Sequence, residues 1–327
     1  MSIIEVSQLR KFYSVHKKES GLRGSLKSIF KRQYEEVRAV DDISFEIKEG
    51  ELVGFIGPNG AGKTTTLKCL SGLLYPTSGF VSVLDYQPWE RKPEFQKQFA
   101  LVMGQKNQLW WDLPPMETFL LNKEIYEIPH EQFKKTLDEM VELLEVEDIL
   151  KIQTRKLSLG QRMKCELIAA LIHTPSVLFL DEPTIGLDVV MQKKIRDFIK
   201  EYNRRYKATV ILTSHYMGDV KELCERVMII DRGKLVFDGA LEKIVKKYAN
   251  YKVISVILGE KVGLEKLKEL CKVKEFAYPK VNFIVGKEEA SKMTAKILEE
   301  LSVIDLNIEE PPIEEIIRDL FTKKNYA

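Results

Sequence analysis

The sequence predicts an α/β protein whose main domain is a doubly wound parallel sheet. Two observations lead to this fold class. Apolar strands of the fully buried type alternate with helical patterns between residues 51 and 212, as in sheets that are covered by helices on both faces. A glycine-rich turn joins the first of these strands to a helix. After residue 239 the order becomes βαββαβ, which predicts a smaller α+β domain of the split-βαβ type.

The elements of the main domain follow from local patterns of apolar residues. Strands are expected at residues 3–6, 43–47, 51–57, 177–180 and 209–212. Helical patterns begin at Lys63 and cover about 114–156 and 191–206. The apolar stripe of the long helical stretch consists of Phe133, Leu137, Met140, Val141 and Leu144. This spacing predicts helices that bury one face.

The smaller domain is expected to contain four strands and two helices. Its strands are expected at residues 252–258, 273–277, 281–285 and 303–308, and its helices at 264–271 and 288–301. A last amphipathic helix is expected at 313–321, after two prolines. The sequence therefore predicts two domains, a main domain at 1–240 and a small accessory domain at 251–327.

Composition narrows the functional classes before any motif is considered. The chain has 327 residues, with 51 basic and 49 acidic side chains and a formal net charge of +2, which argues against a protein that coats a polyanion. No apolar run approaches the about 20 residues of a membrane-spanning helix, and no signal peptide is visible. The four cysteines are scattered without metal-ligand spacing, which favours a soluble protein of the reducing cytosol.

The strongest motif is a P-loop between the predicted strand at 51–57 and the following helix. Its glycines allow backbone N–H groups to face a β-phosphate, and the helix N-terminus adds partial positive charge. Lys63 can reach the β- and γ-phosphates, and the Thr64 hydroxyl can bind Mg²⁺. The candidate nucleotide-binding residues of this segment are Gly57, Pro58, Asn59, Gly60, Ala61, Gly62, Lys63, Thr64 and Thr65.

Two adjacent carboxylates, Asp181 and Glu182, end the predicted strand at 177–180. A carboxylate at a strand end beside a P-loop is placed to hold Mg²⁺. Glu182 can orient and polarise an attacking water molecule. Two acids that only solvate a strand end are the alternative, and the P-loop makes that alternative weaker.

The segment before this strand, Leu157-Ser158-Leu159-Gly160-Gln161, resembles the signature loop of ATP-binding-cassette (ABC) ATPases. The resemblance covers about residues 3–240. Further elements of that family follow in the expected order: Gln105 resembles the Q-loop glutamine, Asp188 the D-loop aspartate and His215 the switch histidine, and Tyr13 resembles the aromatic that stacks on adenine. Several ordered elements are far more specific than a single P-loop.

The resemblance implies an ABC ATPase core with a parallel sheet, an antiparallel β subdomain and a helical subdomain at about 106–172. It implies ATP and Mg²⁺ as ligands, with the metal held by Thr64, Gln105 and Asp181. It implies catalytic roles for Lys63, Gln105, Glu182 and His215. It also implies a head-to-tail dimer, in which Ser158, Gly160 and Gln161 cover ATP that is bound by the second copy. The family has glycine where this chain has Leu159, and leucine tolerates fewer backbone conformations than glycine.

The resemblance further implies a transport subunit that drives export through separately encoded transmembrane permease chains. Such a subunit associates peripherally with the cytoplasmic face of the bacterial cell membrane, and no nucleic-acid partner is expected. The alternative is an ABC ATPase that acts on DNA or ribosomes. The interval between Lys63 and Ser158 has room for the helical subdomain and little else, and the chain has one P-loop. Both features favour transport.

Three features leave alternatives open. Trp110 and Trp111 either anchor the coupling helix of a permease or pack against the helical subdomain. A basic insert at about 16–38 reads as a short amphipathic helix, either at the membrane or permease surface or simply solvated. Phe12 and Tyr34 compete with Tyr13 for contact with adenine.

Overall fold

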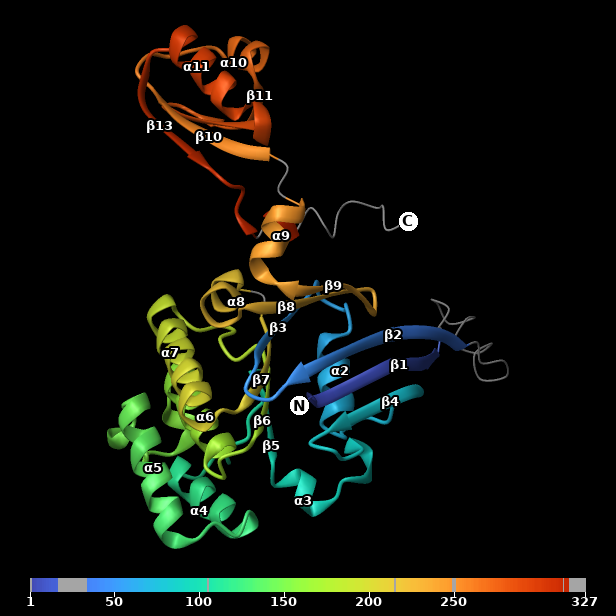
Figure 1. Ribbon diagram of the computed structural model, residues 1–327. Coiled ribbons are helices and arrows are strands. Elements are labelled where there is room, and N and C mark those ends of the chain that lie inside the picture. Colours follow the sequence, from blue (N-terminus) through green and yellow to red (C-terminus); the bar gives the residue numbers. More distant parts are fainter. Residues whose placement is uncertain are drawn as a thin grey trace, which may run out of the picture. The chain divides into compact units, whose positions relative to one another are not determined.

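The structure is a computed structural model that describes residues 2–16, 34–104, 106–214, 216–248, 251–313 and 315–317. Figure 1 shows the course of the chain. The chain divides into two compact units, Met1–Gly239 and Ala240–Ala327. Each unit is described by itself. Within the described residues, no helix is both long and apolar enough to cross a lipid bilayer.

A six-stranded sheet forms the centre of the first unit. Its strands lie in the order β5 (Phe99–Met103), β6 (Val177–Asp181), β7 (Thr209–Thr213), β3 (Leu52–Ile56), β8 (Arg226–Asp231) and β9 (Lys234–Ala240). The first five strands pair in parallel. Every residue of β6 and β7 is buried, because helices cover both faces: α2 (Lys63–Leu70) lies on one side, and α6 (Leu159–Leu171) and α7 (Val189–Tyr206) lie on the other (Figure 1). The predicted doubly wound sheet is confirmed.

A second, antiparallel sheet consists of β1 (Ser2–His16), β2 (Tyr34–Lys48) and β4 (Ser78–Val83), in the order β2-β1-β4. It shares one apolar core with β3 and α2, which includes Ile4, Val6, Phe55 and Leu67. The predicted basic insert at 16–38 needs correction, because both of its ends are strand. His16 pairs with Tyr34, and Tyr13 pairs with Val37, so residues 34–38 extend β2. The predicted amphipathic helix itself lies outside the described residues.

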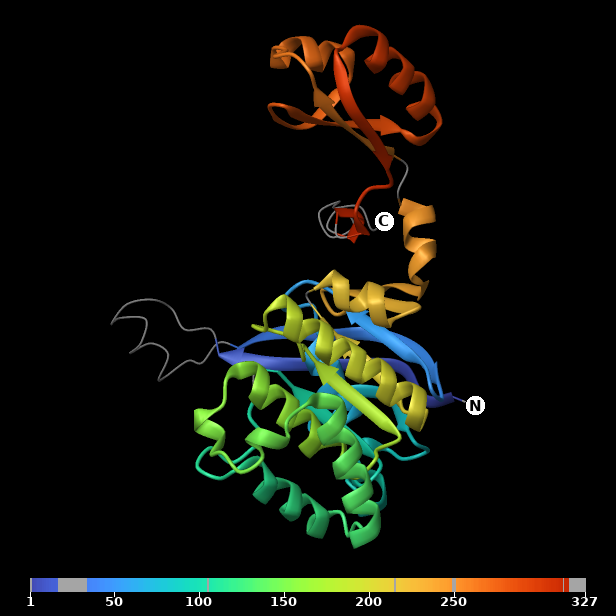
Figure 2. The ribbon, with the colours of Figure 1, turned by 90° about the vertical axis from the view of Figure 1, so that its left-hand side faces the viewer.

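The helical segment contains α4 (Pro115–Ile125), α5 (His130–Leu144) and α6, which lie together at one end of the first unit (Figures 1 and 2). Four residues of the predicted apolar stripe on α5 are buried, namely Phe133, Leu137, Met140 and Leu144. The fifth, Val141, is half-buried. A short helix, α3 (Pro93–Gln96), precedes β5. Because the signature segment begins α6, this helical packing fixes its position relative to the parallel sheet.

The second unit begins with α9 (Leu241–Tyr248) and continues as a four-stranded antiparallel sheet. The order of its strands is β11 (Lys272–Ala277), β12 (Lys280–Gly286), β10 (Tyr251–Leu258) and β13 (Val303–Glu309). The helices α10 (Leu264–Leu270) and α11 (Ala290–Glu300) complete the predicted βαββαβ order. The core is apolar and is centred on Ile254, Val256, Phe283 and Ile297. Of the last predicted helix, residues 313 and 315–317 are described and helical.

Candidate functional site

The P-loop joins β3 to α2, and close contacts explain its glycines. A Cβ atom on Gly57 would lie 2.2 Å from the carbonyl oxygen of Ile230. A Cβ on Gly62, whose φ is 112°, would lie 2.3 Å from the carbonyl oxygen of Ala39. Gly62 is also the N-cap of α2. The loop therefore ends at the N-terminus of α2, which is a position that favours anions.

The side chain of Lys63 is held by the loop itself. Its Nζ donates hydrogen bonds to the carbonyl oxygens of Gly57 at 2.7 Å and Pro58 at 3.1 Å. Burial lowers the pKa of the Lys63 ammonium, and the carboxylates of Glu182 and Asp181 oppose that shift. The arrangement places a desolvated amine, near two carboxylates, over the loop that would hold phosphate groups.

Asp181 lies at the end of β6 and connects three elements. The Thr64 hydroxyl of α2 donates to its Oδ2 at 2.7 Å, and the Thr213 hydroxyl of β7 donates to its Oδ1 at 2.6 Å. Both carboxylate oxygens are thereby oriented. A hydroxyl and a carboxylate this close together are oxygen donors of the kind that Mg²⁺ prefers. The pair fits the predicted metal site, although the described residues contain no group of three or more His, Cys, Asp or Glu side chains for a metal ion.

Glu182 follows Asp181 in a left-handed backbone conformation, with a φ of 56°. Its backbone N–H donates to the carbonyl and the hydroxyl oxygens of Thr213, both at 3.1 Å. A non-glycine residue with this φ costs about 1–3 kcal/mol and persists where neighbours hold it. A pocket of about 220 Å³ lies beside it, lined by Thr64, Lys68, Met103, Lys106, Asp181 and Glu182. Lys106 was not predicted as a site residue, because the only feature in the sequence that pointed to it was its position directly after Gln105.

The signature segment is a capped helix start. Ser158 is the N-cap of α6, and its hydroxyl accepts from the Gln161 backbone N–H at 3.2 Å while the Gln161 side chain accepts from the Ser158 N–H at 3.0 Å. Leu159 is 39% exposed, and one of its methyl carbons lies 3.1 Å from where a Gly186 Cβ would stand. Gly160 lies against Met191. The signature segment and the D-loop therefore pack together within one chain.

Two further predicted residues have structural partners in this chain. Asp188 is the N-cap of α7, and its Oδ1 accepts from the Met191 backbone N–H at 2.9 Å. Tyr13 lies on β1, with the Lys11 Nζ at 5.2 Å from its ring centroid. Neither residue lines the 220 Å³ pocket.

The predicted site residues thus fall into groups. Lys63, Thr64, Asp181 and Glu182 meet at one end of the parallel sheet. Ser158, Gly160, Gln161 and Asp188 form a second group at the starts of α6 and α7, and none of them lines that pocket. Gln105 and His215 lie outside the described residues.

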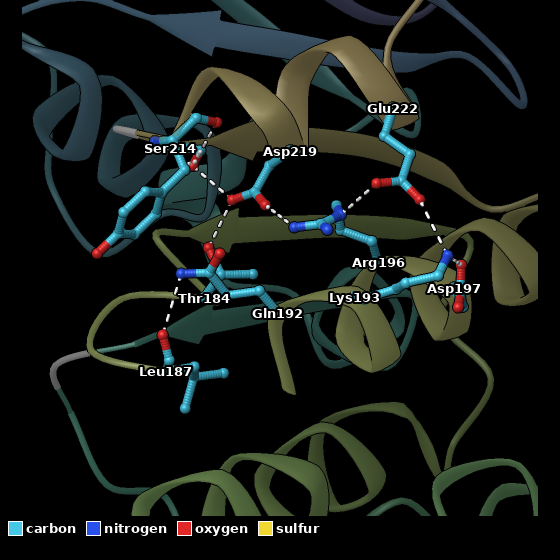
Figure 3. A network of polar contacts seen from close by, with 10 residues as sticks. Thr184, Leu187, Gln192, Lys193, Arg196, Asp197, Ser214, Asp219 and Glu222 are labelled. Atoms are coloured by element: carbon cyan, nitrogen blue, oxygen red, sulfur yellow. Dashed lines mark hydrogen bonds and ion pairs between the residues drawn. The ribbon is translucent and has the colours of Figure 1, made fainter. Parts of the chain in front are cut away.

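Sequence reasoning also missed Asp219, which is fully buried on α8 (Met217–Leu223). It accepts hydrogen bonds from Thr184, Ser214 and Arg196 (Figure 3). The one signal in the sequence was an acidic residue four positions after His215, which alone does not separate a buried carboxylate from a solvated one.

A larger groove of about 700 Å³ lies elsewhere in the first unit, between β5 and the helices α4 and α6. Trp110 lines it together with Leu101, Leu121 and Tyr126. Trp110 is 57% exposed and Trp111 is 49% exposed, and the Arg162 guanidinium lies 5.7 Å from a Trp111 ring centroid. Large exposed aromatics beside a groove are typical of a protein interface, which favours the prediction that the tryptophans anchor a partner. Each tryptophan also contacts the helical segment, so the packing alternative stays open beside it.

Comparisons with known proteins match both units. Residues 40–185 match the family model for ABC transporters, and residues 250–309 match the model for the C-terminal domain of EvrA-like ABC transporters. NatA, an ABC transporter ATP-binding protein of Bacillus subtilis, is 32% identical over 208 residues, which are 64% of this chain and 84% of NatA. The Nod factor export ATP-binding protein I of Burkholderia pseudomallei is 30% identical over 225 residues, which are 69% and 73% of the two chains.

A solved structure shares the fold of the first unit. It is the dimeric post-hydrolysis state of the ATP-binding cassette MJ0796 with bound ADP and Pi. The TM-score is 0.60 at 23% identity, and the match covers 72% of this chain and 98% of the cassette.

Proposed function

The chain belongs to the ATP-binding proteins of ABC transporters, and on that premise we propose that it hydrolyses ATP with Lys63, Asp181 and Glu182 to power export through a separate permease. As a member of the family it is the ATP-binding and ATP-hydrolysing subunit of a transporter. Both matching family models describe ABC transporters, which favours transport over action on DNA or ribosomes. The contact between Thr64 and Asp181 beside Glu182 is the observation that carries the proposed chemistry.

In this proposal the P-loop N–H groups and Lys63 hold the β- and γ-phosphates, and the remaining loop residues from Gly57 to Thr65 shape the cradle. Glu182 orients the attacking water and accepts its proton. Thr64 and Asp181 would hold Mg²⁺, with Gln105 as a further ligand by family resemblance. Bound Mg²⁺ neutralises phosphate charge that develops during the reaction. His215 has a catalytic role on the same resemblance, and Tyr13 stacks on adenine.

The active assembly in this proposal is a head-to-tail dimer of two copies. Ser158, Gly160, Gln161 and Asp188 lie away from the chain's own 220 Å³ pocket, so they are available for ATP that is bound by the second copy. The solved structure of the cassette MJ0796 described above is a dimer in a post-hydrolysis state. Leu159 replaces the family glycine without disturbing the capped start of α6, which supports a working signature loop. ATP would favour the closed dimer and ADP would not, so hydrolysis resets the transporter.

The permease contact in this proposal is the 700 Å³ groove. Its wall combines apolar side chains with Trp110, and an exposed tryptophan at a groove edge is suited to anchor a helix from a partner. The basic segment between β1 and β2 contacts the membrane or the permease in this proposal, and the subunit would then associate peripherally with the cytoplasmic face of a bacterial membrane. The outward direction follows the subfamily resemblance and the Nod factor export relative.

The domain boundaries belong to the same proposal. Residues 1–240 form the nucleotide-binding domain, with the helical subdomain at about 106–172, and residues 251–327 form the accessory domain. The C-terminal match to EvrA-like ABC transporters supports an accessory domain that is specific to transporters of this kind.

The metal site is tested by the Mg²⁺ dependence of ATP hydrolysis in two variants. Thr64→Val keeps the side-chain shape but removes the hydroxyl. We expect the Mg²⁺ concentration for half-maximal ATPase activity to rise by about 10-fold or more. Thr64→Ser keeps the hydroxyl and should behave like the wild type. Equal Mg²⁺ dependence of the two variants would contradict the site.

Transport with co-purified permease subunits tests the direction of transport, and inward movement of the substrate would contradict export.

A further inference from the structure

Asp219 is a carboxylate with no solvent exposure. A buried carboxylate is costly unless hydrogen bonds satisfy it. Here Oδ2 accepts from the Thr184 hydroxyl at 2.5 Å and from the Ser214 hydroxyl at 2.7 Å, and Oδ1 accepts from Arg196 Nη1 at 2.9 Å. Figure 3 shows the carboxylate between the two hydroxyls and the guanidinium. A fully satisfied buried charge of this kind fixes the segments that supply its partners.

Two of those segments carry, or adjoin, the proposed catalytic residues. Thr184 follows Glu182 by two residues in the same turn. At the start of this turn, the Glu182 N–H donates hydrogen bonds to the carbonyl and hydroxyl oxygens of Thr213. Ser214 immediately precedes residue 215, and its hydroxyl oxygen also accepts from the Tyr216 backbone N–H at 3.0 Å. A single oxygen atom, Oδ2 of Asp219, therefore connects the turn that bears Glu182 to Ser214 at the end of β7.

The third segment is α7, which supplies Arg196. This helix starts directly after Asp188, its N-cap. The D-loop thus lies between two residues that bind Asp219, namely Thr184 before it and Arg196 after it. The carboxylate on α8 therefore binds the chain on both sides of the D-loop, at Thr184 before it and on α7 after it.

We propose that Asp219 is a positioning residue for ATP hydrolysis, which aligns the Glu182 turn, Ser214 and the D-loop with one another. The inference rests on the proposed role of Glu182. Asp219 acts through Thr184 and Ser214 and does not line the pocket beside Glu182. Its loss should therefore slow the chemical step while ATP binding at the P-loop stays intact, because a misplacement of about 1 Å near the reacting groups can lower a rate about 100-fold.

The network offers a matched control on the same arginine. Arg196 Nε donates to Glu222 Oε2 at 2.6 Å, and the Glu222 side chain is 38% exposed. Glu222→Gln removes a carboxylate from Arg196 on the solvent side and leaves the bonds of Asp219 in place. Thr184 offers a second pair of variants, because Thr184→Val removes the hydroxyl and Thr184→Ser keeps it.

The test compares kcat, KM and equilibrium ATP binding in the full-length chain, with thermal unfolding to confirm that each variant is folded. For Asp219→Asn we expect kcat to fall by about 10-fold to 100-fold, with KM and ATP affinity within about 2-fold of the wild type. Thr184→Val should show a smaller loss of kcat alone. Thr184→Ser and Glu222→Gln should turn over at the wild-type rate. The variant that combines Asp219→Asn with Thr184→Val should be no slower than Asp219→Asn alone, because both substitutions remove the same contact.

Wild-type kcat in folded Asp219→Asn or Thr184→Val would overturn the inference, as would a loss of ATP binding that matches the loss of kcat. If Asp219→Asn does not fold, the comparison of Thr184→Val with Thr184→Ser decides. Glu182→Gln separates this test from that of the proposed function. If Glu182→Gln lowers kcat and Thr184→Val does not, only the positioning role of Asp219 is contradicted. If Glu182→Gln keeps the wild-type kcat, the proposed role of Glu182 as the catalytic base is contradicted.

Discussion

The two units bury different kinds of side chain. Among the described residues, every buried polar or charged residue belongs to the first unit, including Lys63, Glu166, Asp181 and Asp219. The buried residues of the second unit are apolar. Buried polar groups are costly, and a protein retains them where they orient one another or act chemically. The contrast indicates that the chemistry resides in the first unit.

The largest effect expected from this contrast is on nucleotide binding. Lys63→Ala removes the cation from the phosphate cradle, and losing one partner of a desolvated charge pair should weaken ATP binding about 1000-fold, or about 4 kcal/mol. Equilibrium binding of ATP to the full-length chain measures this. Lys68→Ala, on the same helix at the pocket edge, is the comparison and should bind ATP much more tightly than Lys63→Ala. ATP affinity near wild type in Lys63→Ala would show that the cradle is elsewhere.

The second unit should respond in stability and not in catalysis. Phe283 is fully buried in its apolar core, so Phe283→Ala should cost about 3 kcal/mol in the free energy of unfolding of that unit. Ile257→Ala, at a side chain with 36% exposure, should cost far less. Denaturant unfolding and basal ATPase of the same preparations check both statements. A loss of basal ATPase in folded Phe283→Ala would place part of the chemistry in the second unit.

An effect of intermediate size is expected where the first unit meets a partner through its surface. Replacing Trp110 by alanine should lower permease-stimulated ATPase by about 10-fold or more while basal ATPase stays unchanged, because a buried aromatic anchor contributes about 2 kcal/mol to an interface. Leu120→Ala, an exposed apolar residue at 43% that does not line the groove, is the matched control. Equal stimulation of the two variants would refute the groove as the docking surface.

The smallest effect is a pH dependence confined to the first unit. His173 stacks on Tyr126 with ring centroids 3.8 Å apart, and burial lowers the pKa of His173 to about 4, against the weaker effect of the Phe99 carbonyl. This pKa lies below the ordinary histidine value of about 6.5, so the unfolded state binds the proton more readily than the folded state. The folded state therefore loses stability as pH falls from about 6.5 towards 4. The first unit should lose about 1 kcal/mol between pH 7.5 and 5.5 through this group.

His173→Phe keeps an aromatic ring for Tyr126 and removes the titrating nitrogen. Denaturant unfolding at the two pH values should therefore show a smaller loss for the variant than for the wild type. An identical loss in both proteins would assign the pH dependence to other groups.

Much of this architecture follows from the sequence because its causes are local. Alternation and apolar runs predicted β3, β6, β7 and the βαββαβ order of the second unit. The glycine pattern predicted the P-loop, and the contacts of Gly57 and Gly62 show why no larger residue fits. Residues 34–38 were assigned to the basic insert because their pairing with β1 is a long-range property that the local sequence does not show.

The polar contacts between distant segments could not be predicted. Thr184, Arg196, Ser214 and Asp219 come from separate elements, and their meeting depends on the parallel sheet bringing strand ends together. The same holds for Leu159, whose neighbour Gly186 is contributed by the D-loop. Local patterns report which face of a helix is buried, whereas the partners of a buried carboxylate are set by the tertiary fold.

Glu182→Gln is the most direct test of the claim that the first unit carries the chemistry. The variant keeps the size of the side chain and removes its basicity, so we expect ATP turnover to fall by about 100-fold or more while ATP still binds and drives two full-length chains into a dimer. Turnover and light scattering with Mg²⁺ and ATP measure both quantities in one preparation. A slow, ATP-dependent dimer is the predicted result, and turnover at the wild-type rate would contradict the account.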